Sequence, residues 1–387
     1  MERLERSLQA IMEKHRIVGL SAAVVRRGED VWTGAYGQAD LESGRPMTTA
    51  TAFRIASISK VFVATALLQL VEKGLCALDS DAGELLGFPF RHPHYPEGKV
   101  TLAHLLTHTS GLQDEYVRFA VDSRKENPPL IRLEELMVTG GRYHTEDLWG
   151  RTMPGDPHGF EYSNLGAIVL ATIVEKLSGE RFDVYCRRHL FEPLRMMNSS
   201  FRLADFANPN RLAVLYSYSE EKHAYEANLD DFKTGMPESV DYSGYIPGTN
   251  GALFSPQGGL RSTAADLAKF MLTHLNGGEA EGTRILKPET IRLMHKPHWS
   301  GYRTDGFFRN SGLQLQLTDD LFPGRRLIGH AGDAYGLLSD WFFDPEEGWG
   351  IVLLMNGLRQ TKGDGVFFEA EEDLFRLLYE EWIHSHL

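Results

Sequence analysis

The stretch Phe53-Arg-Ile-Ala-Ser-Ile-Ser-Lys60 carries the strongest structural signal in this chain. A threonine-rich approach precedes it and the apolar run 61–71 follows it, so Ser57 is predicted to begin a buried helix. Residues three apart on a helix share a face, which places the Ser57 hydroxyl beside the Lys60 amine. A serine becomes a nucleophile when a neighbouring group removes its proton, and a desolvated lysine can do this. The Ser-x-x-Lys spacing therefore indicates acyl-transfer chemistry.

The same spacing occurs a second time, at Ser219-Glu-Glu-Lys222. That match lies in the polar stretch 217–225 with no buried helix behind it, so we expect a surface turn there. For Ser57, the structural alternative is a helix N-cap with a surface lysine one turn further on. Additional motifs are needed to decide between catalysis and capping.

A second candidate motif is Tyr162-Ser-Asn164, which lies between Gly159-Phe-Glu161 and the apolar run 165–177. This order predicts a loop that enters another helix. A tyrosine can act as a general base or acid when a nearby ammonium lowers its pKa. An asparagine can hold a substrate amide and a lysine amine at once. Capping of the helix by Ser and Asn is the structural alternative.

A third candidate is His330-Ala331-Gly332, which follows the apolar Leu327-Ile-Gly329 and precedes the apolar segments 341–343 and 350–355. These segments predict strands. A donor or cationic side chain followed two residues later by glycine would let a strand edge approach a bound acyl group closely. Lys233-Thr-Gly235 shows a related pattern, but its polar surroundings do not predict a strand, and we therefore favour His330.

Ser57-x-x-Lys60, Tyr162-x-Asn164 and His330-x-Gly332, in this order, resemble the three motifs of the serine β-lactamase and penicillin-binding-protein family. The most similar branch holds class C β-lactamases, D-Ala-D-Ala carboxypeptidases and the related carboxylesterases. Three further stretches support the resemblance: 105–112, 258–270 and 344–348. The similarity therefore extends over nearly the whole chain.

This resemblance implies a mechanism and a set of site residues. Ser57 would attack a carbonyl to form an acyl-enzyme, with Lys60 and Tyr162 as a coupled proton relay. Which of the two is the general base stays open. The backbone N–H groups of Ser57 and Asp333 would form the oxyanion hole. The other residues expected to bind the substrate are Asn164, His330, Ala331 and Gly332.

The order of the predicted elements indicates an α/β (α+β) fold. The elements expected outside the middle of the chain are a helix at 1–16, a strand pair at 19–25 and 30–36, short strands from Leu313 onward, and a helix at 367–383. One antiparallel β-sheet flanked by N- and C-terminal helices accommodates them, with the mostly helical region 76–254 inserted. We expect a sheet lobe of residues 1–75 with 255–387. The resemblance implies the same β-lactamase/transpeptidase-like fold, with the active site between the lobes.

The composition bounds the partners and the location. A net charge of −13 over 387 residues argues against nucleic-acid or anionic-membrane partners. No apolar run reaches the length of a membrane span, and the charged, amphipathic residues 1–16 predict a helix rather than a secretory signal. Two cysteines, Cys76 and Cys186, give no disulfide framework. A cytoplasmic protein is expected, and export of an already processed chain is the alternative.

The substrate class is inferred from charge near the third motif. Relatives that bind penicillins or D-Ala-D-Ala ends hold the substrate carboxylate with a cation and hydroxyl groups there. Here Ala331 and Asp333 offer no hydroxyl and one negative charge. A neutral ester or amide, or a substrate with a cationic amine, is therefore expected to bind better than a β-lactam. Alternatively, Asp333 points into solvent or pairs with Arg325 or Arg326.

Two other kinds of protein fit parts of the sequence. A metallohydrolase is suggested by His104-Leu-Leu-Thr-His108 and by His92-Pro-His94, because histidines four apart on a helix can share a zinc ion. Leu105 stands where the zincin pattern needs a glutamate, so packing of these histidines is favoured. The other alternative is a penicillin-binding or sensor module that is acylated and never turns over. The main prediction is a serine acyl hydrolase without a cofactor, acting on a small-molecule or peptide substrate.

Overall fold

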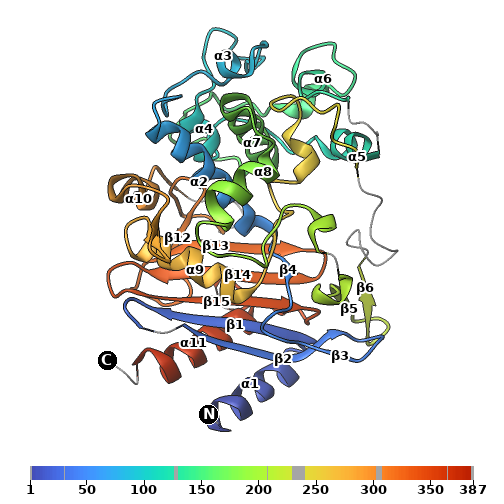
Figure 1. Cartoon of the computed structure of the whole chain (residues 1–387), viewed down its shortest axis with the longest axis vertical. Helices are drawn as coiled ribbons and strands as arrows, with labels where there is room; N and C mark the ends of the chain where they lie inside the picture. Colours follow the sequence, from blue (N-terminus) through green and yellow to red (C-terminus); the bar gives the residue numbers. More distant parts are fainter. Residues whose placement is uncertain are drawn as a thin grey trace.

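The computed structural model describes residues 2–29, 31–125, 130–206, 208–228, 240–301, 307–363 and 365–384. Figure 1 shows a large β-sheet in the lower part of the view and a mostly helical part above it, with both termini at the sheet end. The sequence Lys233-Thr-Gly235, which was the weaker candidate for the third motif, lies outside the described residues.

Within the described residues, nine strands form one antiparallel sheet in the order β10-β11-β12-β13-β14-β15-β1-β2-β3. In that order the strands are Trp299–Ser300, Asn310–Ser311, Gln316–Thr318, Leu327–Ala334, Leu337–Asp344, Trp349–Asn356, Gly19–Arg26, Trp32–Asp40 and Arg45–Pro46. β1 and β15 pair over their full length, from Gly19 with Asn356 to Arg26 with Trp349. The antiparallel sheet predicted from the first hairpin and the late strands is confirmed.

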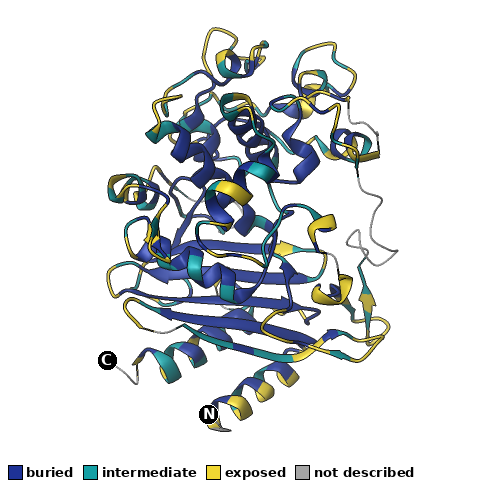
Figure 2. Ribbon diagram, in the orientation of Figure 1, coloured by how far each residue is buried: buried dark blue, intermediate teal, exposed yellow. Residues whose placement is uncertain are grey.

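Helices cover both faces of the sheet, which explains why its long central strands are buried throughout (Figure 2). α1 (Glu2–Lys14) and α11 (Glu369–Trp382) cover one face, and their apolar side chains join sheet residues such as Phe342 and Leu353 in one cluster. α9 (Ala264–Leu275) covers the other face, where Trp341 Nε1 donates to the carbonyl of Leu267 at 3.1 Å. The two terminal helices expected from the sequence are therefore present.

The helical part is built around two helices that are buried nearly all round, α2 (Ser59–Glu72) and α7 (Asn164–Ser178). The shorter helices are α3 (Ala82–Leu86), α4 (Leu102–Leu106), α5 (Val117–Lys125), α6 (Glu134–Met137), α8 (Phe182–Cys186) and α10 (Pro288–His295). The small strand pairs are β4 (Phe53–Arg54) with β7 (Arg261–Ser262), β5 (Tyr216–Ser219) with β6 (Ala224–Ala227), and β8 (Glu279–Ala280) with β9 (Thr283–Arg284).

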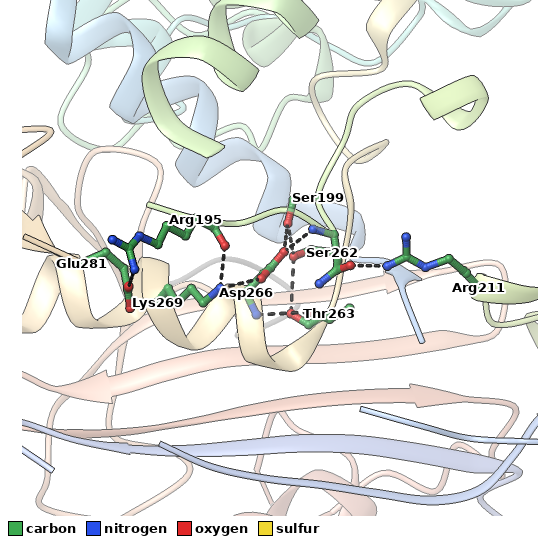
Figure 3. Close-up of polar contacts among 9 residues, drawn as sticks. Arg195, Ser199, Arg211, Ser262, Thr263, Asp266, Lys269 and Glu281 are labelled. Atoms are coloured by element: carbon green, nitrogen blue, oxygen red, sulfur yellow. Dashed lines mark hydrogen bonds and ion pairs between the residues drawn. The ribbon is translucent and has the colours of Figure 1, made fainter. Parts of the chain in front are cut away.

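Polar contacts fix the start of α9, as Figure 3 shows. The Thr263 hydroxyl caps the helix by accepting the N–H of Asp266 at 3.2 Å. The Asp266 carboxylate accepts the N–H of Asn198 at 2.8 Å and the Ser199 hydroxyl at 3.0 Å, and Lys269 Nζ lies 3.2 Å from it. These contacts tie the segment that leaves the helical part to the helix that covers the sheet.

Part of the range assigned to the helical lobe bonds to the sheet instead. The N–H of Ala213 donates to the carbonyl of Ala52 at 2.9 Å, and the N–H of Val214 donates to that of Ala39 at 2.8 Å. Asn356 Nδ2 then donates to the carbonyl of Val214 at 2.6 Å. Residues 213 and 214 thus bond to the sheet side although they fall in the range 76–254. The limits of the two lobes otherwise stay a prediction. No helix in the described part of the chain is long and apolar enough to cross a membrane.

Candidate active site

Ser57 lies in a single 3₁₀ turn, Ala56–Ile58, that leads directly into α2. The preceding Ala56 has φ of 45°, a left-handed conformation that costs a non-glycine residue about 1 kcal/mol or more. The buried Ser59 holds this turn: its hydroxyl donates to the carbonyl of Ala56 at 2.6 Å and accepts the N–H of Leu260 at 3.2 Å. The buried helix expected at Ser57 is present, although α2 itself begins at Ser59 and Ser57 lies in the 3₁₀ turn before it. The sequence did not reveal the part played by Ser59.

Lys60 is fully buried one turn after Ser57, with Nζ 3.0 Å from Ser57 Oγ. The amine also donates to the backbone carbonyl of Gln257 at 2.6 Å. Burial lowers the pKa of Lys60 to about 7, and the negative charge of Asp114 opposes this shift. An amine with this pKa is unprotonated in a large share of molecules at neutral pH. It can therefore accept the proton of the Ser57 hydroxyl.

Tyr162 lies immediately beside this amine. Lys60 Nζ is 4.9 Å from the centroid of the tyrosine ring, and the ring also contacts those of His108 at 4.6 Å and Phe308 at 5.3 Å between centroids. His108 Nδ1 accepts the N–H of Ser163 at 3.2 Å, which fixes the backbone next to the tyrosine. The structure thus brings together the first two predicted motifs, which are about a hundred residues apart in the chain.

Asn164 is the first residue of α7, and its side chain is held by Asp114. Asn164 Nδ2 donates to Asp114 Oδ2 at 2.6 Å, and Asp114 Oδ1 accepts the N–H groups of Asn164 at 2.7 Å and Leu165 at 3.0 Å. Sequence reasoning missed Asp114. Its only sequence signal is its place two residues after the 105–112 stretch that supports the family resemblance.

His330 lies on β13 and faces the site, with its ring 6.1 Å from that of Tyr162. Its Nδ1 lies 2.6 Å from the carbonyl of Ala331. Because a carbonyl only accepts, Nδ1 carries the proton and Nε2 is left as an acceptor. Burial, together with the charge of Lys60, lowers the pKa of His330 to about 3. The side chain is therefore neutral, and it supplies no cation for a substrate carboxylate.

Gly332 is where β13 meets the turn that carries Ser57. A Cβ at this position would lie 2.5 Å from Ser339 Oγ, 2.8 Å from the carbonyl oxygen of Ile55 and 3.0 Å from the Ala56 side chain. No side chain fits in that space, so glycine is required for this approach. The close contact brings the backbone of Gly332 and its neighbours against the serine turn, as an oxyanion hole built on both would need.

The side chain of Asp333 lies on the opposite face of β13 from His330. Its carboxylate oxygens are each 3.5 Å from Gln360 Nε2, and its cross-strand partner Leu338 belongs to the core under α1 and α11. The negative charge that the sequence suggested near the substrate therefore lies on the other face of the strand, turned away from the serine. Arg325 pairs with Asp344 and Glu347, so the alternative pairing with that arginine is not seen.

The second Ser-x-x-Lys match and the histidines of the zinc alternative have structural roles. Ser219 and Lys222 belong to the exposed β5–β6 hairpin, where Lys222 pairs with Glu226, so the surface turn is confirmed. α4 ends at Leu106, before His108, and the two histidines of the zinc alternative therefore do not share a helix face. His104 instead forms a capping box with Thr101. Among the described residues, no group of three or more His, Cys, Asp or Glu side chains could hold a metal ion.

Comparison with known proteins finds relatives along nearly the whole chain. The family model named Beta-lactamase matches residues 4–370. Penicillin-binding protein 4 of Amycolatopsis lactamdurans is 30% identical over 96% of this chain and 87% of its own length. Esterase EstB of Burkholderia gladioli is 35% identical over 92% of this chain and 90% of its own length.

Among solved structures, D-amino acid amidase from Ochrobactrum anthropi, complexed with L-phenylalanine amide, aligns over 100% of both chains. Its TM-score is 0.70 and its identity 23%, so it shows a shared fold. The family model and the two relatives cover almost the whole of the sequence, including both the sheet and the inserted helices. The chain therefore belongs to the Beta-lactamase family, whose fold carries serine hydrolases.

Proposed function

We propose that this protein hydrolyses esters or amides through an acyl-enzyme on Ser57. The observation that carries the proposal is the pair formed by Ser57 and Lys60, in which a buried amine with a pKa of about 7 lies 3.0 Å from the serine hydroxyl. A nucleophile with an adjacent base near neutrality is the arrangement that acyl transfer requires.

In the first step, Ser57 Oγ attacks the substrate carbonyl and its proton passes to Lys60, directly or with Tyr162 as a relay. The developing negative charge on the carbonyl oxygen is stabilised by the N–H groups of Ser57 and Asp333. The same relay returns the proton to the leaving alcohol or amine. Water then attacks the acyl-enzyme by the reverse transfers, which frees the acid and restores Ser57.

The charges around Ser57 favour substrates without a carboxylate. His330 is neutral because of its burial, and Lys60 is committed to Ser57 and Gln257. A penicillin carboxylate would therefore meet no free cation from the three motifs, whereas a neutral ester or amide needs none. The esterase named among the relatives supports this choice, and the charge of Asp333 no longer contributes to it.

The proposal is tested by intact-mass spectrometry after mixing the protein with a p-nitrophenyl ester or with benzylpenicillin and following the mass over time. With the ester, we expect a transient acyl adduct and continuous release of p-nitrophenol. Ser57→Ala should abolish both, while Ser219→Ala, in the second Ser-x-x-Lys match, should leave both unchanged. Hydrolysis that survives Ser57→Ala would refute the proposal.

The relatives named as penicillin-binding proteins define a second outcome. A stable penicillin adduct on Ser57 without product release, together with no ester turnover, would assign the protein to the acylated, non-turnover class. Rapid loss of the penicillin adduct with release of penicilloic acid would extend the substrate range to β-lactams. In both cases Ser57 remains the acylated residue.

A further inference from the structure

Asp114 lies on the loop that follows α4, and it makes more contacts to the start of α7 than a single helix cap needs. Besides the N–H groups of Asn164 and Leu165 and the Asn164 amide, its carboxylate accepts the hydroxyl of Ser163 at 3.3 Å. Ser163 already caps α7 by accepting the N–H of Gly166 at 3.1 Å. Asp114 therefore shares the capping of α7 with Ser163, and it also holds the Asn164 side chain, which a helix cap does not require.

We propose that Asp114 is a positioning residue of the acyl-transfer site, which fixes the Tyr162-x-Asn164 segment against Lys60 and supplies the counter-charge that this buried amine meets. The inference rests on the proposed function, because it concerns the same serine and lysine. It assigns a role to a residue outside the three motifs.

The positioning part follows from the hydrogen bonds. Nδ2 of Asn164 is bound to the carboxylate, so the amide oxygen on the same carbon is turned away from Asp114. Tyr162 precedes the anchored Asn164 by two residues, and its ring lies against Lys60. A shift of Asp114 would therefore move both side chains of the second motif together.

The charge part follows from the groups around Lys60. In the 3₁₀ turn before α2 there is the Ser57 hydroxyl, on the loop before α7 there is the Tyr162 ring, and on β13 there is the neutral His330. The loop before β7 contributes the Gln257 carbonyl. The side chain of that residue also binds Tyr116, whose own pKa is raised to about 12 by burial, so that this tyrosine is uncharged at neutral pH.

The negative charge of Asp114 acts on Lys60 and favours the ammonium form. Without it, burial alone would lower the pKa of Lys60 further. Asp114 therefore keeps the pKa of the Lys60 amine close to neutral pH, where the amine can both accept and return a proton. A purely structural cap would have no such effect on protonation.

The test is the pH dependence of the rate at which a neutral fluorophosphonate labels Ser57 in the intact protein. In Asp114→Asn, the midpoint controlled by Lys60 should move to lower pH by about one unit, the lower end of the range for a lost opposite charge nearby. Asp81→Asn is the matched control: Asp81 caps α3 through the N–H of Gly83 at 2.8 Å and pairs with Arg91, away from the three motifs. Its midpoint should equal that of the wild type.

Asp114→Glu provides a second variant that keeps the charge and changes the cap geometry. Its midpoint should stay within a few tenths of a unit of the wild-type value while its maximal labelling rate falls. An unchanged midpoint in folded Asp114→Asn, or a lowered midpoint in Asp114→Glu, would overturn the inference. Failure of the proposed function looks different: the wild type would not be labelled, or Ser57→Ala would still be labelled.

Discussion

Burial and charge act on the Lys60 amine in opposite directions. Burial removes water from the ammonium and lowers its pKa to about 7, while Asp114 favours the charged form. A general base works best when its pKa is near the working pH. The amine of Lys60 meets that condition, and the neighbouring His330 is neutral and adds no positive charge.

Tyr162→Phe tests whether the tyrosine hydroxyl takes part in proton transfer. We expect kcat for ester hydrolysis to fall on the order of a hundredfold, the usual scale for a lost acid–base group, with the thermal midpoint nearly unchanged because the ring contacts remain. Tyr218→Phe, in the β5–β6 hairpin, should keep the wild-type rate. A near-normal rate in Tyr162→Phe would assign Tyr162 to packing against His108 and Phe308.

Asp333→Ser tests the orientation of the Asp333 side chain. Because the carboxylate faces Gln360 and not the serine, the ratio of kcat/KM for benzylpenicillin to kcat/KM for a neutral ester should change less than about threefold, since screening weakens a charge on the far face. The ratio is measured for both proteins at the same salt concentration. A rise of tenfold or more in favour of penicillin would show that the carboxylate acts on the substrate after all.

The direction of the Asp333 side chain was predictable from the sequence. His330 and Asp333 are three residues apart, and successive side chains of a strand alternate between faces, so a strand that directs His330 to the site directs Asp333 away from it. Ser57 and Lys60 were predictable because one helical turn holds both. Asp114 was not, because it comes from a loop fifty residues before Asn164 in the chain, and no local pattern links the two.

At the scale of elements, the site depends on how closely β13 approaches the serine turn. The hydroxyl of Ser339 on β14 donates to the carbonyl of Ile55 at 3.1 Å and so ties the sheet to the segment before Ser57. Ser59 fixes the same turn from the side of α2. The nucleophile is thus held by contacts from the sheet and from its own helix.

Gly332→Ala should push β13 away from the turn that carries Ser57. The added methyl group would overlap Ser339 Oγ and the carbonyl oxygen of Ile55, and overpacking of this kind costs about 1–3 kcal/mol. We expect a lower thermal midpoint and at least a tenfold loss of kcat/KM, since misplaced catalytic groups lose rate steeply. In Gly98→Ala the new Cβ meets only the carbonyl of Tyr95 at 3.4 Å, so both quantities should stay normal. Full activity in Gly332→Ala would show that β13 need not lie so close.

Element types were largely predictable, whereas their neighbours were not. The 3.6-residue pattern of 1–16 and the alternating apolar segments after Leu313 indicated the helix and strands that the structure contains. Nothing in these periods indicates that β1 lies between β15 and β2. The order of strands depends on long-range pairing, and so does the attachment of residues 213 and 214 to the sheet.

At the scale of the whole molecule, the face of the sheet under α11 contains two buried carboxyl groups, Asp340 on β14 and Glu371 on α11. Burial raises the pKa of Asp340 to about 7, and burial together with the neighbouring Asp340 raises that of Glu371 well above its usual range. The folded protein therefore holds protons that the unfolded chain has released at the same pH. This contribution to stability is complete below pH 4 and is lost as the pH rises toward 7 and above.

Asp340→Asn should remove part of the stability loss that accompanies a rise in pH. The free energy of unfolding of the variant, relative to that of the wild type, should increase by on the order of 1–2 kcal/mol between pH 4.5 and pH 8. Urea titrations at matched pH values measure the difference, which cancels the opposite effect of buried histidines such as His274, whose pKa is lowered by burial. Glu371→Gln should give a difference of the same sign. A difference that is constant with pH would show that Asp340 is ionised in the folded protein.

The pairing of β1 with β15 also has a consequence for synthesis on the ribosome. β1 leaves the exit tunnel long before β15, the strand that borders it from Gly19 with Asn356 to Arg26 with Trp349. Until then the nascent hairpin β1–β2 has an open edge, which invites pairing with other chains. Ser57 and Lys60 are likewise translated long before β13, which begins at Leu327. A ribosome that stalls before that point releases a polypeptide that has its nucleophile but lacks the strand that completes the site.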